Sequence, residues 1–515
     1  MRSTFAGLSI ASSGLFAAQR ALDITGHNIS NTNTRGYTRQ RLNQSAQDPM
    51  NIQGGQGQLG LGVKMQFISQ VRDEMLDIKY RQEVNTLGEW EEKYNSLTQV
   101  ESIFNEPSDT GIRKIMDGFF EGINSLTKDP SNPTNRSVFL QKAIGLAQNF
   151  NDMYSRFEKM VVDSNEEVEA SVRAINSMAT QIAKLNRQIL ESELDGSRAN
   201  DLRDARNLLI DDLSKLVDLE VKNVPINEGK SSTLTILIQG TPLVNHVDTN
   251  VLELVPKQDH PMYTDGQLMD PQREDLKNIK VSNIKWASGS SLNQDKLGGT
   301  IGGQLQQRDG FKDETKGTAY YIRFLSEFSN AFAKEINNIH KNGFALNGAG
   351  VSGEDLFKGD STGFISASQI KVNQVLLDDP TKLALGLGDG SPDNNKNALE
   401  MLNLRNNKDF IISLGYPGPP ATTVTLGKGT PEDVLKTMIA SLGVDAQEAK
   451  RMFNNQQYLT EEVDSFRLSV SGVSQDEEMS NMIKFQHAYN AAARMITTVD
   501  EMIDVIINRM GRVGL

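Results

Sequence analysis

The feature that most constrains this chain is a run of apolar residues with seven-residue spacing at its C-terminal end. One row consists of Met482, Tyr489, Ile496, Ile503 and Met510, and a second row three positions later consists of Phe485, Ala492, Val499, Ile506 and Val513. No polar residue interrupts either row. This spacing predicts an α-helix that supercoils around a partner helix, because a helix lying on a globular core normally shows a broader apolar face.

The N-terminal end carries a shorter version of the same pattern. Leu8, Leu15, Leu22 and Ile29 are spaced by seven residues, and Ala11, Ala18 and Thr25 follow the first three of them at three positions' distance. Helices over Thr4–Ile29 and Asp476–Arg509 would be about 40 Å and about 50 Å long at 1.5 Å per residue, so their lengths allow them to pair. The alternative is that each end is an ordinary amphipathic helix packed onto the body of the protein.

We expect the pairing of the two ends to depend on assembly. Burial of a large apolar side chain contributes roughly 1.5–3 kcal/mol, whereas ordering one residue costs about 1.5 kcal/mol. One pair of helices is therefore marginal, and we expect both ends to be largely disordered in the monomer and to fold between subunits. The predicted seam between helices and between subunits consists of Leu8, Leu15, Leu22, Ile29, Met482, Phe485, Tyr489, Ile496, Val499, Ile503 and Ile506.

Composition excludes several classes of protein. Cysteine is absent from all 515 positions, which rules out disulfides, thiolate metal sites and a cysteine nucleophile. The net charge of −13 comes without a basic cluster containing aromatic residues, so we expect no nucleic-acid binding. No segment reaches the roughly 20 consecutive apolar residues that cross a bilayer, so we expect no membrane insertion. The uncharged stretch between Arg2 and Arg20 is broken by serine and glycine, and we expect no cleaved signal peptide.

The segments between the two ends predict a helical bundle with β-rich insertions. Helical patterns cover residues 73–105, 112–127, 134–193, 198–217, 304–341 and 431–470, whereas residues 234–238 and 251–255 are rich in strand-forming residues. The expected fold class is mainly α with inserted β domains, elongated, with paired terminal coiled-coil helices and a helical-bundle middle domain. The expected domains are an N-terminal arm (1–35), a linker (36–70), the first part of the bundle (71–220), an inserted β-rich outer domain (221–303), a return helix (304–345), a mixed α/β segment or second insertion (346–430), the last part of the bundle (431–475) and a C-terminal arm (476–515).

No motif in the chain predicts a catalytic, cofactor or metal site. The histidines, at positions 27, 246, 260, 340 and 487, form no metal-binding spacing, and we interpret His340 as a cap or dipole partner at a helix C-terminus. The glycines at 54–62 and 298–303 match no phosphate-binding motif and are interpreted as turns. Carboxylate pairs such as Glu91-Glu92, Glu166-Glu167 and Asp211-Asp212 are interpreted as solvated charges. We therefore expect the protein not to be an enzyme.

A motif directly after the first helix resembles a known family. The run Asn28-Ile29-Ser30-Asn31-Thr32-Asn33-Thr34-Arg35-Gly36-Tyr37 is similar to the signature shared by flagellar rod, hook and hook-associated proteins. Tyr37 followed by Arg39-Gln40 narrows the resemblance to the FlgK family of hook-associated proteins. The polar side chains can satisfy the backbone at the helix end, and Gly36 can take a positive φ, so the motif predicts a helix stop followed by an extended segment.

A second motif, near the C-terminus, resembles the same family. Gly472 through Asp476-Glu477-Glu478, continuing into Phe485–Arg494, is similar to the C-terminal FlgK signature. Ser474 or Asp476 can cap the helix, and the three acids suit the positive end of its dipole. Two internal segments, Gly298–Asp309 and Asn337–Gly343, also resemble the family.

The resemblance implies a structural subunit at the junction between the flagellar hook and filament. It implies an extracellular location on the bacterial flagellum, reached through the flagellar type III export apparatus without a cleaved signal peptide. The implied partners are further copies of the chain in a helical ring or tube, the hook protein, the second hook-associated protein, the filament, and an export chaperone on the C-terminal arm. The alternatives are another axial protein of hook or rod, an adhesin-like protein that binds through its inserted β domain, and a wall hydrolase on an axial scaffold.

Overall fold

The computed structural model describes residues 6–51, 58–104, 111–194, 196–226, 231–259, 279–312, 315–346, 353–359, 363–388, 391–416, 422–505 and 507. These residues divide between two compact units. Unit 1 comprises Met1–Val84, Ile175–Val251 and Gln457–Leu515, and unit 2 comprises Asn85–Ala174 and Leu252–Gln456. The segment predicted as one inserted domain (221–303) is thus divided between the two units, and the predicted domain boundaries remain predictions.

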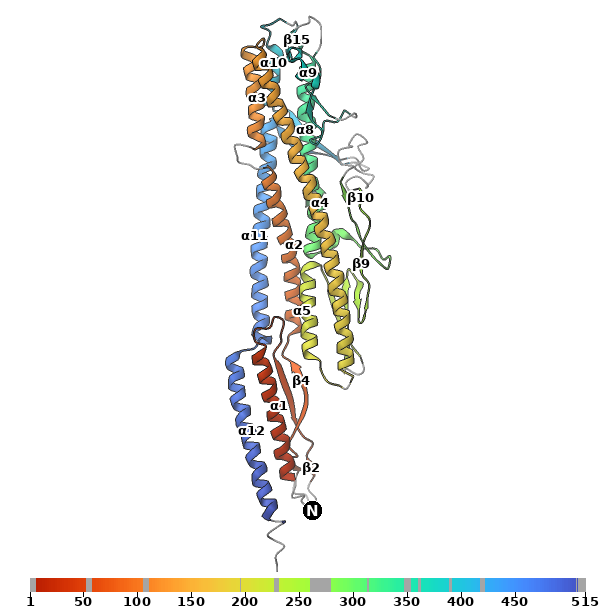
Figure 1. Cartoon of the computed structure of the whole chain (residues 1–515), viewed down its shortest axis with the longest axis vertical. Coiled ribbons are helices and arrows are strands. Elements are labelled where there is room, and N and C mark those ends of the chain that lie inside the picture. Colours follow the sequence, from red (N-terminus) through yellow and green to blue (C-terminus); the bar gives the residue numbers. More distant parts are fainter. Residues whose placement is uncertain are drawn as a thin grey trace, which may run out of the picture. The chain divides into compact units, whose positions relative to one another are not determined.

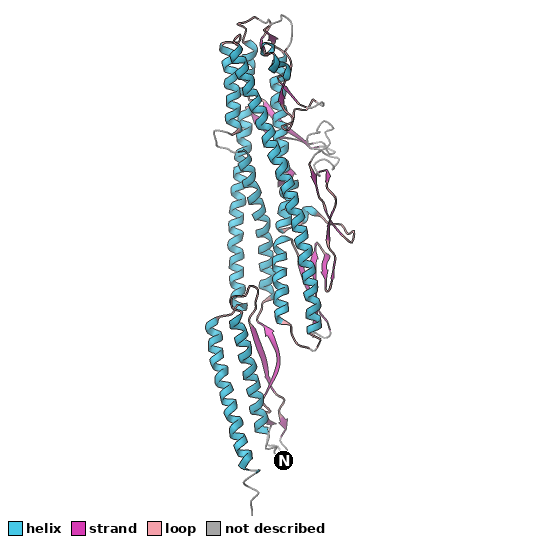
Figure 2. Ribbon diagram, in the orientation of Figure 1, coloured by secondary structure: helices cyan, strands magenta, loops and turns pink. Residues whose placement is uncertain are grey.

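Long helices dominate the described residues, which confirms the predicted mainly α fold class (Figures 1 and 2). The helices are α1 (Ala6–Ser30), α2 (Glu74–Phe104), α3 (Ile112–Lys128), α4 (Pro133–Ser192), α5 (Asn200–Leu216), α7 (Gly299–Asp309), α8 (Thr318–Lys341), α9 (Gln374–Asp378), α10 (Lys396–Asn403), α11 (Pro431–Ser471) and α12 (Gln475–Asp504). Most of these bounds lie within a few residues of the predicted ones, because long segments with regular apolar spacing are the clearest signal in a sequence.

The strands of unit 1 form two larger elements beside the helices. Strands β1 (Gln40–Ala46) and β4 (Val63–Gln70) pair antiparallel in a hairpin with an irregular register between Leu42 and Gln44, and β2 (Met50–Asn51) pairs with β3 (Gln58–Leu59). A four-stranded sheet joins β5 (Glu220–Ile226), β6 (Ser231–Ile238), β7 (Thr241–Asn245) and β8 (Asp248–Thr249) in that order. The segment predicted as a linker therefore contains a hairpin, which packs against α1.

The strands of unit 2 are short and occur in pairs. The pairs are β9 (Leu252–Leu254) with β12 (Ile284–Trp286), β10 (Gln258–Asp259) with β11 (Lys280–Val281), β13 (Phe311–Lys312) with β14 (Thr315–Lys316), β15 (Phe344–Ala345) with β18 (Ala384–Gly386), β16 (Phe357–Lys358) with β17 (Lys371–Val372), and β19 (Phe410–Tyr416) with β20 (Thr422–Gly429). Within the segment predicted as mixed α/β (346–430), residues 364–375 form only β17 and the start of α9.

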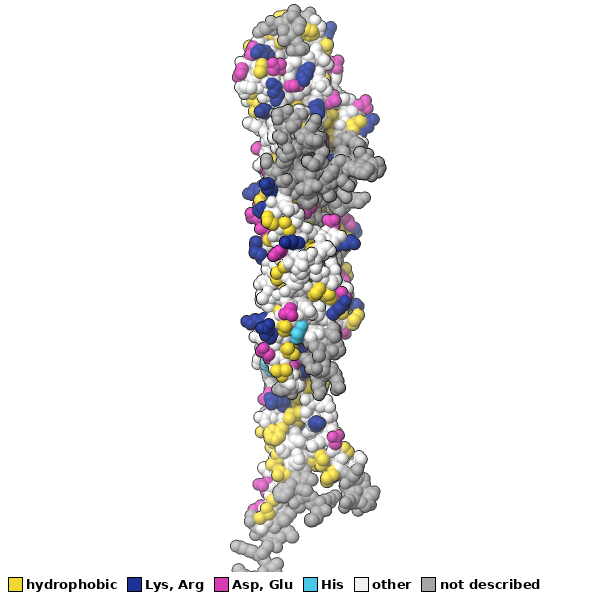
Figure 3. All heavy atoms as spheres, turned by 90° about the vertical axis from the view of Figure 1, so that its right-hand side faces the viewer, with side chains coloured by type: hydrophobic (Ala, Val, Ile, Leu, Met, Phe, Trp, Pro, Cys, Tyr) yellow, Lys and Arg dark blue, Asp and Glu magenta, His cyan; other side chains and the backbone are white. Residues whose placement is uncertain are grey.

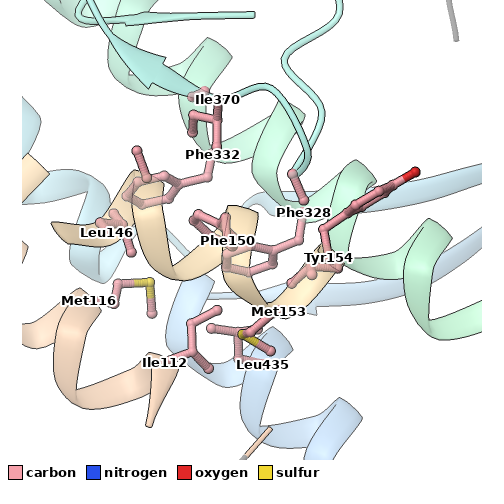
Figure 4. Close-up of a cluster of buried hydrophobic side chains, with 14 of the residues drawn as sticks. Ile112, Met116, Leu146, Phe150, Met153, Tyr154, Phe328, Phe332, Ile370 and Leu435 are labelled. Carbon is pink, nitrogen blue, oxygen red and sulfur yellow. The ribbon is translucent and has the colours of Figure 1, made fainter. Parts of the chain in front are cut away.

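Aromatic side chains fill the core of unit 2 (Figure 4). Helix α3 buries one side, which includes Met116 and Phe119, and the Phe119 ring lies 5.7 Å from that of Phe332 on α8. Phe328 stacks one turn away from Phe332 at 6.2 Å and lies 6.0 Å from Phe150 on α4. Offset and tilted rings of this kind contribute beyond their buried area, so this cluster adds to the stability that the aliphatic core residues give to unit 2.

The glycine cluster at 298–303 is a helix and not the predicted turn. Gly302 and Gly303 lie inside α7, and a Cβ atom on Gly302 would stand 1.9 Å from the carbonyl oxygen of Leu297. A Cβ atom on Gly303 would stand 2.9 Å from the carbonyl oxygen of Glu89 on α2. The prediction was wrong for Gly302 and Gly303, which permit close packing of α7, whereas Gly299 has a φ of +73° and takes the left-handed backbone conformation of a turn residue.

Candidate functional site

Helices α1 and α12 lie side by side in unit 1 and run antiparallel (Figure 1). A Cβ atom on Gly7 would lie 3.7 Å from a methyl group of Val499, and at the other end the Asn28 amide bonds to the Glu478 carboxylate. The pairing predicted from the two heptad patterns is therefore confirmed within one chain.

The large residues of the predicted seam are covered only in part. All ten of those that lie in the described residues are half-buried: Leu8, Leu15, Leu22, Ile29, Met482, Phe485, Tyr489, Ile496, Val499 and Ile503. Ile506 lies outside the described residues. The fully buried apolar residues of α1 are instead mostly small: Ala11, Ala17, Ala18, Ala21 and Ile24.

Helix α1 has two covered sides, and the sequence indicated only one of them. It contacts α12 on one side and the β1–β4 hairpin on another. Ser13 bonds through its Oγ to the Val63 amide at 3.2 Å, and a Cβ atom on Gly62 would collide with that oxygen. Ala17, Ala21 and Ile24 follow helical spacing beside the heptad row, which was the available signal for the second side.

Asn28 holds the end of α1 to the start of the hairpin. Its side-chain oxygen accepts from the Gln40 amide at 3.0 Å and from the Tyr37 hydroxyl at 2.7 Å. Its Nδ2 donates to the Gln40 carbonyl at 2.9 Å and to Glu478 Oε2 at 3.1 Å. The Asn28 side chain thus bonds to both the backbone N–H and the carbonyl of Gln40, as a residue of a neighbouring strand would. Asn28 is 1% exposed, and its bonds to Gln40 and Glu478 are buried, whereas that from Tyr37 is partly buried.

Glu478 and Arg39 complete this polar cluster from the C-terminal side. The Glu478 side chain is 3% exposed and accepts from the Arg39 guanidinium at 2.8 Å. Arg39 also bonds to the exposed Glu477 at 2.7 Å, and its backbone amide donates to the Ser471 carbonyl at 2.9 Å. Residues from both terminal motifs therefore meet in one place. We call Asn28, Tyr37, Arg39, Gln40 and Glu478 the polar lock.

The remaining motif residues shape the backbone around the polar lock. Asn31 caps the end of α1 by donating from Nδ2 to the His27 carbonyl at 3.0 Å. Gly36 has a φ of +81°, as predicted, and any Cβ there would press on Leu208. A Cβ on Gly472 would stand 2.4 Å from the Leu468 carbonyl. Ser474 caps α12, whose first turn carries Asp476 and Glu477, and this confirms one of the two predicted caps.

Buried acids on α5 anchor the hairpin, and the sequence did not indicate them. Asp204 is 5% exposed and accepts from the Thr38 amide at 3.0 Å and from Gln70 Nε2 at 2.7 Å. Burial raises the pKa of Asp204 to about 6, although the bonds from Thr38 and the charge of Arg72 lower it. Single acids within an amphipathic helix have no distinctive spacing, so only the fold identifies them.

Asp211 corrects the interpretation of the carboxylate pairs as solvated charges. It is 8% exposed and bonds to Arg81 at 2.7 Å and to Arg467 at 2.6 Å. The Arg467 guanidinium also lies 3.8 Å above the Tyr80 ring. These contacts join α2, α5 and the last turns of α11 within unit 1, and the pair of arginines compensates the buried charge.

His340 in unit 2 corrects a second interpretation. Its side chain is fully buried, with Nε2 accepting from the Ala384 amide at 3.0 Å and Nδ1 bonded to the Glu354 carbonyl. Burial lowers the pKa of His340 to about 4, so the ring is neutral near pH 7. The neutral ring joins α8 to the backbone of Glu354 and Ala384 in the core. The interpretation of His340 as a cationic dipole partner was wrong.

Within the described ranges, no group of three or more His, Cys, Asp or Glu side chains is arranged to hold a metal ion. Among the same residues, each helix is too short or too polar to pass through a bilayer.

Comparison with known proteins identifies the family. The model of the flagellar hook-associated protein FlgK helical domain matches residues 97–357. The model of the flagella basal body rod protein matches residues 8–38, and that of the flagellar basal body rod FlgEFG protein C-terminal region matches residues 465–510. The two rod-protein matches cover most of α1, all of α12 and three residues of the polar lock, Asn28, Tyr37 and Glu478.

Two relatives align over nearly the whole chain. Flagellar hook-associated protein 1 of Bacillus subtilis is 32% identical over 530 residues, covering 99% of each chain. That of Salmonella typhimurium is 25% identical over 574 residues, covering 97% of this chain and 98% of the relative. The structure of the flagellar hook junction protein FlgK from Burkholderia pseudomallei matches with a TM-score of 0.57 at 14% identity, covering 78% of this chain and all of that one, and is similar in fold. The chain therefore belongs to the flagellar hook-associated protein 1 (FlgK) family.

Proposed function

We propose that this chain is a structural subunit of the bacterial flagellum that forms the junction between hook and filament, and that α1 and α12 are its assembly element. The names of the relatives, hook-associated protein and hook junction protein, support the location. The half-buried seam supports the means of assembly.

The single observation that carries this proposal is the partial covering of the seam. Large residues such as Leu15, Phe485 and Ile496 stay half-buried although their helices are already paired. A coiled coil stabilised only within one chain would bury such residues fully, because they supply most of its hydrophobic free energy. The part of each side chain that stays exposed is apolar surface that further copies of the chain can cover.

The polar lock has a defined role in this proposal. A buried polar contact in an otherwise apolar pair fixes the register of two helices. Asn28 and Glu478 lie at one end of the α1–α12 pair and are bonded to each other and to the start of the hairpin. We assign them the task of setting where α12 begins relative to α1 when the ends fold during assembly.

The partners and the route of export follow as proposals. We assign to the chain contacts with further copies in a helical ring or tube, with the hook protein, and with the second hook-associated protein and filament. Before assembly, Ile483, Met495 and Met502 on α12 are more than half exposed, and an export chaperone on this arm would keep them from aggregating. Export without a cleaved signal peptide, and the absence of enzymatic activity, belong to the same proposal.

Deletion of either arm tests the function. Cells that produce the chain without residues 1–35, or without residues 476–515, should make hooks without filaments and release flagellin as monomer. The control is a chain in which residues 260–278, between β10 and β11, are replaced by a short linker, and it should still support filaments. Normal filaments from both arm deletions would refute the junction assignment, and loss of adhesion with intact motility in the control would favour a binding role of the β segment.

A further inference from the structure

The last turns of α11 expose apolar residues while they cover polar ones. Thr460 and Ser471 are 8% and 9% exposed, and Arg467 bonds to Asp211 inside unit 1. In contrast, Leu459, Phe466 and Val470 are 47%, 58% and 41% exposed. This distribution is the reverse of a normal surface helix, whose apolar side faces its own chain. Exposed apolar patches on folded proteins commonly mark surfaces that a partner covers.

These three residues form a continuous row. Residues at i, i+7 and i+11 lie above one another on an α-helix, so Leu459, Phe466 and Val470 share one side of α11, which we call the α11 row. Glu462 lies three residues after Leu459 and four before Phe466, and it is exposed. The α11 row is thus an apolar strip with a negative charge at its edge.

The β1–β4 hairpin carries a patch with the opposite charge. Met65 and Phe67 on β4 are 42% and 38% exposed. The Arg198 guanidinium lies 4.3 Å above the Phe67 ring. At the register shift between Leu42 and Gln44, Phe67 lies opposite Asn43, two residues from Arg41 and on the same side of the hairpin, whereas Met65 pairs with Gln44 on the other side. We call Phe67, Arg41 and Arg198 the hairpin patch.

The position of the hairpin leaves this patch accessible. In Figure 1, β4 and α12 lie on opposite sides of α1. Figure 3 faces the side of the hairpin, and hydrophobic side chains are exposed in its lower part. Because the α11 row and the hairpin patch are both exposed, neither covers the other within the chain.

We propose that the α11 row of one subunit binds the hairpin patch of the next copy of the same chain. The two surfaces are both apolar at the centre, and Glu462 is opposite in charge to Arg41 and Arg198. Two different surfaces of one chain that bind each other make a head-to-tail contact, which propagates into rings or helical arrays. This inference rests on the proposed function and adds a contact outside the α1–α12 seam.

Cysteine cross-linking tests the contact, since the wild-type chain has no cysteine. The double variant Phe67→Cys/Phe466→Cys, assembled in flagella and treated with a short bismaleimide, should give a ladder of dimers, trimers and longer products. Each single variant should remain uncross-linked, and a mixture of the two single variants should give dimers only. The control is Phe67→Cys with Val444→Cys, because Val444 is 64% exposed and lies on α11 outside the row.

The outcomes separate this inference from the proposed function. Filaments that grow on junctions of the double variant but yield no ladder would refute the head-to-tail contact alone. Dimers from Phe466→Cys alone would also refute it, in favour of a row-to-row contact. Absence of even the wild-type chain from the junction would refute the proposed function instead.

Charge reversal provides a second measurement that needs no cross-linker. Glu462→Arg should lower the amount of chain in assembled junctions at least about fivefold, because like charges would then face each other. Adding Arg41→Glu to the same chain should restore most of the loss. Failure of this rescue, with both single variants reduced, would count against the pairing of these two surfaces.

Discussion

Replacing Glu478 with alanine should weaken assembly far more than replacing its neighbour Glu477. Both carboxylates bond to Arg39, at 2.8 Å and 2.7 Å, so the two variants remove the same kind of contact. They differ in burial, since the Glu478 side chain is 3% exposed and that of Glu477 is 61% exposed. Only Glu478 also accepts from Asn28. The pair of variants therefore isolates the effect of the buried position.

The expected magnitude follows from these contacts. Removing one partner of a buried ion pair costs about 3–5 kcal/mol. Arg39 keeps Glu477 and is 24% exposed, so we expect a cost somewhat below that range, about 2–3 kcal/mol. At 1.4 kcal/mol per factor of ten, this corresponds to a roughly thirtyfold to hundredfold weaker assembly. An exposed pair contributes about 0–1 kcal/mol, so Glu477→Ala should cost about fivefold at most.

The assay uses hooks isolated from cells that lack the protein. Fluorescently labelled full-length chain is added, and the concentration that occupies half of the hook ends is measured for the wild type and both variants. Far-UV circular dichroism of the monomers checks that the helical bundle is intact. Equal shifts for the two variants, or no shift for Glu478→Ala, would refute the role assigned to the polar lock.

Three further predictions concern the isolated chain. Amides of α1 and α12 should exchange with solvent much faster than those of α8 in hydrogen-exchange mass spectrometry of the monomer, and equal protection would contradict folding on assembly. The pKa of His340 is lowered from 6.5 to about 4, so between these pH values the unfolded ring binds a proton that the native ring does not. The free energy of unfolding in urea should therefore fall by up to about 3 kcal/mol as the pH drops from 6.5 to 4. The variant His340→Gln should flatten this pH dependence. Gly302→Ala should destabilise unit 2 by about 1–3 kcal/mol through its clash with Leu297, whereas Gly145→Ala in α4, where a Cβ meets nothing within 4 Å, should stabilise it by about 0.5–1 kcal/mol. Tryptophan fluorescence reports both sets of unfolding curves, because Trp90 and Trp286 both lie in unit 2.

The sequence predicted the long helices well because their apolar spacing is regular over many turns. For example, a helix was predicted over residues 134–193, and α4 spans Pro133–Ser192. Shorter elements failed for specific reasons. Strand β1 has the sequence QRLNQSA, in which a single leucine gives no alternation, so its pairing with β4 was not expected. In α7, glycines that permit close packing were interpreted as turn residues.

The candidate site could be predicted in its parts but not in its arrangement. Each terminal motif was visible, and the heptads indicated that the two ends pair. Nothing in the local pattern indicated that Asn28 would bond to Glu478, which lies 450 residues later, since a buried polar contact depends on the tertiary fold. The burial of Asp204 and Asp211 was not predicted for the same reason. It arises because α5 packs beside the hairpin and α11.

The bonding of Asn28 has a chemical consequence for the ageing of an extracellular protein. Its amide supplies an acceptor to the Gln40 amide and donors to the Gln40 carbonyl and Glu478, and only a carboxamide offers both functions at that reach. Hydrolysis of this amide to a carboxylate would turn the donor into an acceptor that faces two further oxygens. Deamidation of Asn28 would therefore make its side chain repel the Gln40 carbonyl and the Glu478 carboxylate, which it now binds. Asn28 is 1% exposed, and this burial keeps water away from the amide.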